Sequence, residues 1–498
     1  MFARIYSVQP SFPSSELVTV EADLSRGLYS FAVVGLPSKA VEEARDRISS
    51  AIKHSGFDSP KSKNHKVVIS LAPADLKKEG TVFDLPMALS YLVSAEDIRF
   101  NPKKTLFIGE LALDGTMRPV RGALSATLAA RANGYTSIIV PRENAKEAAL
   151  VVGVSVFGAS NLKEVVAHVT GSKKIKETPR ESYEDLVGEE SSIDLCDIQG
   201  QESAKRGLEI AASGRHNVAF VGPPGTGKTM LATALAGILP PLSFEEAIEV
   251  TAIHSVAGTL KETLIGTPPI RSPHHTSSYV ALVGGGATLR PGEVTLAHRG
   301  VLFLDEFPEF DRRAIEALRE PLENRSISVS RASGSATFPA NIMLIAAMNP
   351  PTHRADPREI ARFNKKLSGA IVDRIDLWIE VPHVPHEKLN VKSGGEKSDA
   401  VRKRVLGARE KQLARGKQLG IDAKTNSELP GKVLGEEVGV TEEARKTLTG
   451  AAKTLGLSPR SYHRVLRLAR TIADIEGSVQ VKTPHVLEAL QYRPKIFT

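Results

Sequence analysis

The feature that most constrains this 498-residue chain is an eight-residue loop with the pattern G-x-x-x-x-G-K-[ST]. The loop consists of Gly222, Pro223, Pro224, Gly225, Thr226, Gly227, Lys228 and Thr229. An apolar strand pattern precedes it and a helical pattern follows it. Glycines there let backbone N–H groups turn toward phosphates, and the helix N-terminus adds partial positive charge. With Lys228 reaching the outer phosphates and Thr229 ligating Mg²⁺, the loop predicts binding of a nucleoside triphosphate.

Composition indicates an ordinary soluble protein with more than one domain. Hydrophobic residues make up 41% of the sequence and charged residues 24%, which suffices for more than one buried core. The single cysteine, Cys196, excludes an intrachain disulfide and favours a reducing compartment. The sequence contains neither a signal-peptide pattern nor an apolar run of membrane-spanning length, so we expect a cytoplasmic protein without a membrane partner. A formal net charge of +8 permits a nucleic-acid partner without establishing one.

Three blocks follow one another along the chain. Residues 1–170 alternate short strands with helices, and residues 171–192 form a polar, charge-rich linker. Residues 193–385 carry the phosphate loop and alternate strands with helices, which is typical of a parallel α/β sheet. After a charged connector, residues 400–498 contain helical patterns. The sequence therefore predicts an α/β protein with a C-terminal α-helical domain.

Two further apolar strands end in polar residues suited to phosphate chemistry. Residues 300–304 lead into Asp305, which would hold Mg²⁺ through water, and Glu306, which would polarise the attacking water. Residues 342–348 lead into Asn349, whose amide could orient that water beside the γ-phosphate. Taken alone, a turn-forming asparagine before a proline is the better interpretation of Asn349.

In this order the motifs resemble those of AAA+ ATPases: a Walker A loop, a Walker B strand with a catalytic glutamate, and a sensor asparagine. Residues 271–278 (RSPHHTSS), 281–286 (ALVGGG) and 373–377 (DRIDL) are more specific. With them, the whole chain resembles the ComM/YifB family of magnesium-chelatase-like AAA+ ATPases. The resemblance implies ATP and Mg²⁺ as ligands, an AAA+ core over residues 193–385 and a helical lid over residues 400–498. It also implies assembly of identical subunits into a ring, with a hexamer expected.

The resemblance assigns two arginines to the nucleotide. In AAA+ rings an arginine of one subunit contacts the γ-phosphate held by its neighbour, and Arg374 has that place in the family motif. Arg362, on the preceding helix, is the second choice. Arg460, near the start of a predicted helix, best matches the arginine that a lid presents to its own subunit's nucleotide. Surface ion pairs or a solvated helix face are the alternatives.

Two family features concern metals. His274 and His275 are adjacent, so on a strand they would point to opposite faces and could hardly share an ion. No cysteine or carboxylate cluster stands near them in the sequence, and we expect a loop role without a metal. Many relatives carry a cysteine-rich insertion after the sensor asparagine, whereas residues 350–357 contain no cysteine. A metal or redox role of that insertion therefore does not carry over.

The first 170 residues resemble the Lon-protease-type domain of the ribosomal S5 domain 2-like fold, an α+β fold. Active members of that type pair a nucleophilic serine with a lysine. Here Asp84 stands near the serine's place and Leu124 near the lysine's. A carboxylate opposite a leucine cannot form an activated nucleophile. We therefore interpret this domain as a structural or substrate-contacting module without the protease dyad.

Two segments are candidates for DNA contact. Alternating runs at residues 327–331 and 335–338 surround a Gly-containing turn and predict a β-hairpin. In helicase-like AAA+ proteins a hairpin at this place enters the central channel, which makes Arg331 a candidate phosphate ligand. Arg290, behind the glycine-rich loop 284–286, is the second candidate. An ordinary surface hairpin is the alternative for both.

Together these inferences favour a ring-forming ATPase that couples hydrolysis to movement on single-stranded or branched DNA. The resemblance suggests helicase or branch-migration work in recombination or natural transformation. A chelatase-type motor that remodels a protein partner is one alternative, although the fused N-terminal domain argues against it. An ATP-dependent protease is another, which the missing serine–lysine pair disfavours.

Overall fold

The computed structural model describes residues 2–62, 64–186, 193–286, 290–331, 334–351, 356–367, 369–384, 395–435 and 438–494. The chain forms two compact units and crosses between them at three points. The N-terminal unit combines Met1–Val187 with Phe244–Ile265, and the nucleotide-binding unit combines Gly188–Ser243 with Gly266–Thr498. In the described part of the chain, no helix is long and apolar enough to cross a membrane.

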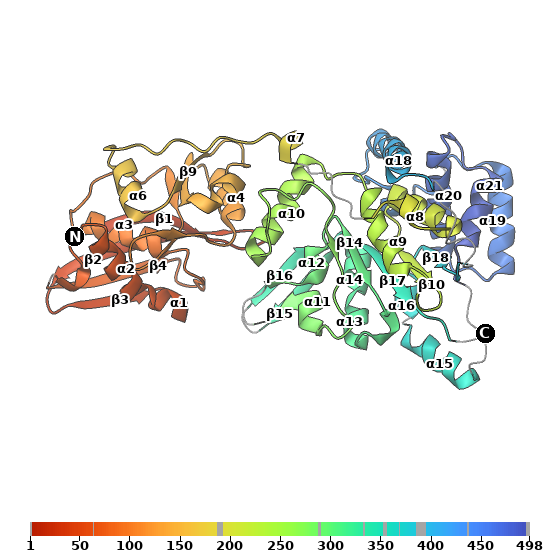
Figure 1. Ribbon diagram of the computed structural model, residues 1–498, viewed down its shortest axis with the longest axis horizontal. Helices are drawn as coiled ribbons and strands as arrows, with labels where there is room; N and C mark the ends of the chain where they lie inside the picture. The colour runs from red at the N-terminus through yellow and green to blue at the C-terminus, as the bar shows by residue number, and fades with distance from the viewer. Residues whose placement is uncertain are drawn as a thin grey trace. The chain divides into compact units, whose positions relative to one another are not determined.

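The N-terminal unit is built on a four-stranded sheet of order β1-β2-β4-β3 (red in Figure 1). Its strands are β1 (Phe2–Gln9), β2 (Glu16–Arg26), β3 (Ser30–Val34) and β4 (His65–Ala72). β1, β2 and β4 pair antiparallel, and β3 pairs parallel with β4. Alternate residues of β2, such as Val18 and Val20, are buried because only one face of the sheet covers the core. Helices α2 (Ala44–His54) and α3 (Asp84–Ser94) contribute to the same core.

A second, parallel sheet of the order β5-β8-β9 shares this core. Its strands are β5 (Thr105–Phe107), β8 (Ser137–Pro141) and β9 (Ser155–Ala159), and the helices beside it are α4 (Ala123–Ala132), α5 (Ala145–Ala148) and α6 (Leu162–Val169). The predicted alternation of strands and helices is present. The assignment of this unit to the Lon-protease type stays a prediction.

One helix of the N-terminal unit comes from the middle of the chain. α10 (Phe244–Ala257) packs against α4. The Ser255 hydroxyl donates to Glu147 Oε2 at 2.7 Å, and the Gly122 N–H donates to Ser255 O at 3.2 Å. Gly122 has a φ of +76°, and a β-carbon there would clash with Pro10. The compact units therefore do not follow the predicted domain ranges, because residues 244–265 group with the N-terminal unit and α10 packs on α4.

The nucleotide-binding unit contains a five-stranded parallel sheet of order β11-β14-β17-β10-β18. Its strands are β10 (Val218–Val221), β11 (Ile270–Arg271), β14 (Val301–Leu304), β17 (Met343–Met348) and β18 (Leu377–Glu380). β10, β14 and β17 are buried at every position, which explains their uninterrupted apolar sequences. The predicted parallel α/β sheet is confirmed.

Helices of the C-terminal region pack beside this sheet (blue in Figure 1). They are α18 (Ser398–Gln418), α19 (Glu442–Thr454), α20 (Pro459–Ile475) and α21 (Thr483–Gln491). α18 and α20 contact α8 (Glu202–Gly214), and their buried side chains join the hydrophobic core of the sheet. The predicted helices are present, but they share a compact unit with the five-stranded sheet. A role as a lid stays a prediction.

Two short hairpins belong to the nucleotide-binding unit. β15 (Ser326–Arg331) and β16 (Gly334–Pro339) pair antiparallel, which confirms the predicted hairpin. β12 (Gly284–Gly285) and β13 (Arg290–Pro291) form a second antiparallel pair, and β12 contacts β15. The two segments singled out for DNA contact are therefore neighbours.

Candidate functional site

The phosphate loop joins β10 to α9 (Lys228–Ala234) at the carboxyl edge of the parallel sheet. Only glycine fits at position 222, because a β-carbon there would lie 2.1 Å from the Val381 carbonyl oxygen. Lys228 is buried, and its Nζ lies 2.8 Å from Gly222 O and 2.9 Å from Asn349 Oδ1. Burial lowers the pKa of Lys228, while the carboxylate of Asp305 acts in the opposite direction. The ammonium group of Lys228 and the side-chain amide of Asn349, the predicted sensor, are thus in direct contact.

Thr229 and Asp305 lie side by side next to this lysine. The Thr229 hydroxyl donates to Asp305 Oδ2 at 3.1 Å. Hydroxyl and carboxylate oxygens are the ligands that Mg²⁺ prefers, and this ion usually takes only one or two protein oxygens beside phosphate and water. The donor set therefore fits Mg²⁺ bound together with a nucleotide.

Glu306 follows Asp305 and has an unusual backbone. Its φ of +51° and ψ of +43° lie in the left-handed region, which costs a non-glycine residue about 1–3 kcal/mol. Its N–H donates to Asp305 Oδ1 at 2.9 Å, and its side chain is 52% exposed. The conformation directs the carboxylate outward beside Asp305, where it can act on a water molecule.

His275 contacts the carboxylate of Glu306. The two histidines lie in a turn between β11 and α11 (Tyr279–Val283), consistent with the expected loop. His275 Nδ1 is 2.9 Å from Glu306 Oε2, and the ring of His274 lies 4.2 Å from that of His275, centroid to centroid. Sequence reasoning missed the contact with Glu306, because nothing local to either residue links the turn to the end of β14.

Arg374 lies at the opposite edge of the sheet from the phosphate loop. It precedes β18, and the amino ends of parallel strands share the edge away from Lys228. Its Nη1 donates to Ala370 O at 2.7 Å, and its Nη2 is paired with Glu323. The predicted role of Arg374 toward the nucleotide of a neighbouring subunit stays a prediction.

Arg460 is found beside Arg374. Its guanidinium is 69% exposed and lies 3.6 Å from Glu323, near the end of α14 (Arg319–Asn324). One turn further along α20, Arg464 donates to Ile375 O at 3.2 Å, so the start of α20 lies at the amino end of β18. The expectation that Arg460 serves its own subunit's nucleotide does not fit this arrangement. The physical reason is that the apolar face of α20 docks on α8 and carries Arg460 to the far edge.

A partly buried polar network holds the segment that carries Arg374. The Asn217 amide donates to Arg374 O at 2.9 Å, and its backbone N–H donates to Asp376 Oδ2 at 3.1 Å. Burial raises the pKa of Asp376, but His216 and Arg464 outweigh it and the net shift is downward. Sequence reasoning missed Asn217 and Glu323, because both act through side-chain contacts between distant segments.

The DNA candidates fall on the two neighbouring hairpins. Arg290 begins β13 and is exposed. Arg331 ends β15, and its side chain lies outside the described part of the structure, as does that of Arg362 on α15 (Pro357–Lys366). The two candidate residues therefore lie on adjacent hairpins. Their contacts with DNA stay a prediction.

Asp84, which the sequence comparison predicts near the place of a protease serine, is held in a buried ion pair. Arg47 Nε lies 2.9 Å from Asp84 Oδ2, and the Leu111 N–H donates to the same oxygen at 3.2 Å. Burial raises the pKa of Asp84 to about 6 despite the guanidinium. Leu124 is fully buried. These contacts are those of a structural ion pair, and the absence of a protease dyad stays a prediction.

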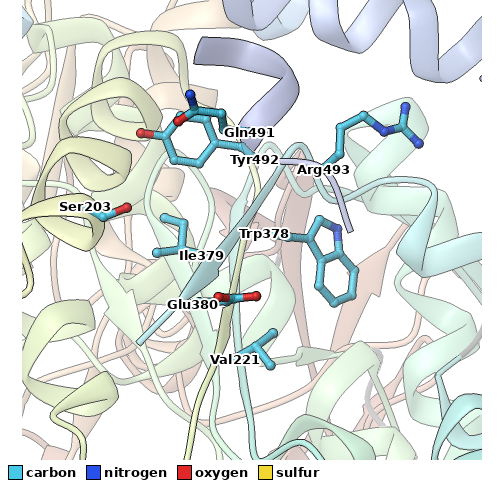
Figure 2. A pocket seen from close by; sticks show the side chains of 8 residues that line it. All are labelled: Ser203, Val221, Trp378, Ile379, Glu380, Gln491, Tyr492 and Arg493. Carbon is cyan, nitrogen blue, oxygen red and sulfur yellow. The ribbon is translucent and has the colours of Figure 1, made fainter. Parts of the chain in front are cut away.

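A pocket of about 370 Å³ opens beside β18 (Figure 2). It is lined by Ser203, Val221, Trp378, Ile379, Glu380, Gln491, Tyr492 and Arg493. The backbone N–H of Trp378 donates to Tyr492 O at 2.8 Å, so the C-terminal segment runs along the edge of β18. Val221 immediately precedes the phosphate loop, but none of the predicted catalytic residues lines the pocket. It therefore adds no residue to the hydrolytic site.

Family models match nearly all of this architecture. A model described as magnesium chelatase, subunit ChlI, matches residues 194–389. A model of subunit ChlI of Mg-chelatase matches residues 20–144, and one of the ChlI C-terminal region matches residues 395–493.

Two relatives similar over nearly their whole length and one distant relative can be compared. The competence protein ComM of Haemophilus influenzae is 43% identical over 508 residues, covering 99% of this chain and 98% of ComM. YifB of Salmonella typhimurium is 45% identical over 489 residues, covering 96% of this chain and 94% of YifB. The DNA replication licensing factor Mcm6 of Drosophila pseudoobscura pseudoobscura is 24% identical over 324 residues, 59% of this chain and 36% of Mcm6.

These matches agree with the site geometry. The phosphate loop, the Thr229–Asp305 pair and Asn349 lie together at the carboxyl edge of the parallel sheet, and the family implies the use of ATP and Mg²⁺. The chain therefore belongs to the ComM/YifB family of magnesium-chelatase-like AAA+ ATPases.

Proposed function

We propose that this ATPase is a cytoplasmic, ring-forming motor that couples ATP hydrolysis to movement on single-stranded or branched DNA. The observation that carries the proposal is the pair of neighbouring hairpins, β12–β13 and β15–β16, one of which is inserted between the helix after β14 and the sensor strand β17. Similarity to the competence protein ComM and, more distantly, to a DNA replication licensing factor adds support. Helicase or branch-migration work in recombination or natural transformation is the activity that we infer.

The chain's own residues divide the hydrolytic work. Lys228 exchanges its loop carbonyl acceptors for the outer phosphates, and its charge offsets the charge that develops there. Glu306 polarises the water, and Asn349 fixes the water's position beside the γ-phosphate. When bound, Mg²⁺ held by Thr229 and Asp305 would neutralise negative charge on the phosphates.

We assign Arg374 and Arg460, which lie at the amino edge of the parallel sheet, to the nucleotide of the neighbouring subunit. Arg374 and Arg460 share Glu323, and the parallel sheet separates them from Lys228 of the same chain. An interface that brings this edge to a neighbour's phosphate loop would complete each site with charge in trans. Repetition of such a head-to-tail contact closes a ring, for which six subunits is our proposal.

The test is DNA stimulation of ATP hydrolysis. We expect forked or four-way-junction DNA to raise the turnover of the wild-type protein, and unfolded or folded protein substrates to leave it unchanged. Replacement of Arg290 by alanine should reduce the DNA-stimulated rate while the DNA-free rate persists. The control is Arg319→Ala, which also removes one positive charge. Arg319 lies at the start of α14 and pairs with Glu316.

A chelatase-type motor that remodels a protein partner is the second candidate. The matches of three magnesium-chelatase models over the chain favour it. An ATP turnover that rises with a protein partner and does not change with DNA of any structure would favour this alternative over the DNA motor.

A further inference from the structure

Glu323, near the end of α14, is shared by two arginines that come from distant parts of the chain. Nη2 of Arg374 donates to Glu323 Oε2, and Nη2 of Arg460 lies 3.6 Å from Glu323 Oε1. Each carboxylate oxygen therefore faces a different guanidinium. The hydrogen bond and the charge of Arg374 lower the pKa of Glu323, and the charge of Arg460 lowers it further, so the side chain is ionised at neutral pH.

A carboxylate between two arginines offsets the repulsion between their positive charges. Like charges that lie close together destabilise each other, and water screens this effect only in part. The Arg374 side chain is 15% exposed, whereas that of Arg460 is 69% exposed. Without the charge of Glu323, we expect the exposed Arg460 side chain to turn away into water and the Nη2 group of Arg374 to lose its partner.

Arg374 is held by two contacts that leave it able to donate further hydrogen bonds. Nη1 donates to Ala370 O of α16 (Gly369–Val372) at 2.7 Å, and Nη2 donates to Glu323. Among the described residues, these contacts use two of the five N–H groups of the guanidinium. The other N–H groups of a guanidinium held in this way suit the oxygens of a phosphate.

The helix that carries Glu323 is anchored to the β15–β16 hairpin. Arg325 follows α14 with a φ of +58° and leads directly into β15. Its carbonyl oxygen accepts the Ala340 N–H at 2.7 Å, and Glu320 Oε1 accepts the Ser328 N–H at 3.0 Å. These bonds tie α14 to both ends of the hairpin, so Glu323 stands on a fixed base.

We propose that Glu323 is a positioning residue that holds Arg374 and Arg460 together as one cationic unit for the nucleotide of the neighbouring subunit. The proposal rests on the proposed function, in which both arginines act on the neighbour's nucleotide. Glu323 acts through the two guanidiniums and does not bind the phosphates. Its loss therefore impairs the arginine side of a subunit interface and leaves the phosphate loop of the same subunit intact.

The first experiment measures kcat and KM for ATP and the melting temperature of Glu323→Ala and Glu323→Asp in the full-length protein. For Glu323→Ala we expect kcat to fall about tenfold to a hundredfold, because a displacement of about 1 Å in a positioned group can cost about a hundredfold. The KM and the melting temperature should stay near the wild-type values. Glu323→Asp keeps the negative charge and should recover most of the loss.

Glu488→Ala is the matched control, because it also removes a carboxylate that is paired with an arginine. Glu488 lies on α21 and accepts hydrogen bonds from Arg206 through both oxygens, at 2.9 and 3.3 Å. Arg206 keeps Glu209 as a partner in this variant, with Nη1 at 3.1 Å from Glu209 Oε2. Glu488→Ala should retain the wild-type kcat.

Mixed rings show on which side of the interface the defect lies. Glu323→Ala subunits mixed with Lys228→Ala subunits should hydrolyse ATP faster than either variant alone, because some interfaces then pair an intact phosphate loop with an intact arginine pair. Glu323→Ala mixed with Arg374→Ala should not exceed the rate of Glu323→Ala alone, since both substitutions affect the same side.

Three results would overturn the proposal. A wild-type kcat in Glu323→Ala would mean that the arginines keep their place without the carboxylate, and a raised kcat would mean that Glu323 withholds them. A lowered kcat that Lys228→Ala subunits do not restore would place the defect outside the arginine side.

Failure of the proposed function gives a different result. If Arg374→Ala and Arg460→Ala keep full hydrolysis, or are not restored by Lys228→Ala subunits, the assignment of the two arginines to the neighbour's nucleotide fails, and the role of Glu323 fails with it. If both arginine variants are restored and Glu323→Ala is as active as the wild type, the role of Glu323 fails alone.

Discussion

We expect the consecutive acidic residues after β14 to have separable tasks. Asp305 bonds to Thr229, whereas Glu306 points outward from a left-handed backbone. We expect Glu306→Gln to retain ATP binding, because the Thr229–Asp305 pair survives, and to lose at least about a hundredfold in kcat, the range for loss of a general base. Steady-state hydrolysis and titration with a fluorescent ATP analogue measure the two effects. Near-normal turnover would remove Glu306 from the mechanism.

Lys228 should control binding itself. Its buried ammonium has acceptors in the loop and on Asn349, and a nucleotide would replace several of them by phosphate oxygens. Lys228→Ala should weaken ATP binding by about tenfold or more, as expected when charge-assisted hydrogen bonds are lost. The same fluorescent titration tests this expectation, with Lys205→Ala on α8, where the lysine pairs with Glu202, as a control for loss of charge. Undiminished affinity would contradict the phosphate-loop assignment.

Residues within contiguous motifs could be predicted from the sequence, and their partners could not. The loop from Gly222 to Thr229 and the Asp305–Glu306 pair are local patterns whose chemistry follows from residue type and spacing. His275 and Glu323 become informative only through contacts made across the fold. No periodicity encodes a contact of that kind, because it depends on which strand ends lie side by side.

At the scale of elements, β10 links the phosphate loop to the segment that carries Arg374. The strand begins after Asn217 and ends at the phosphate loop, and the Asn217 amide holds both Arg374 O and the Leu344 N–H. Asn217→Ala removes two partly buried hydrogen bonds, each of which contributes about 1 kcal/mol. We expect a lower melting temperature and a reduced kcat with an unchanged KM for ATP. A normal kcat in a destabilised protein would restrict Asn217 to a structural role.

The β15–β16 hairpin carries the prediction that most separates a DNA motor from its alternatives. Arg331→Ala should leave basal hydrolysis intact and reduce DNA stimulation and strand displacement. Loss of one phosphate contact per subunit should also lower the log–log salt slope of DNA binding by roughly one unit. Measurement of DNA affinity at several salt concentrations tests this. An unchanged slope with normal unwinding would make Arg331 an ordinary surface residue.

At the scale of the whole molecule, element types were more predictable than their grouping. Parallel strands and C-terminal helices follow from apolar runs and periodicity. The place of α10 does not, because its sequence shows that the helix is buried without indicating against which core. The C-terminal helices likewise share one core with the ATPase sheet, since α18 and α20 dock on α8. Contacts of this type depend on the complementarity of two surfaces that are distant in sequence.

The separation of Arg374 and Lys228 by the sheet leads to a prediction for the assembled ring. Arg374→Ala subunits should bind ATP but lose about a thousandfold in hydrolysis, the lower range for removal of an arginine finger. Arg460→Ala should show the same pattern, since both arginines meet at Glu323.

Mixed rings distinguish action in trans from action within one chain. In a ring that combines Arg374→Ala with Lys228→Ala subunits, some interfaces pair an intact phosphate loop with an intact arginine. Hydrolysis should therefore recover on mixing, to a level set by the fraction of such interfaces, whereas either variant alone stays inactive. Arg460→Ala mixed with Lys228→Ala should recover in the same way. If rings verified as mixed remain inactive, the two arginines do not act on the neighbour's nucleotide, and their pairing with Glu323 is structural.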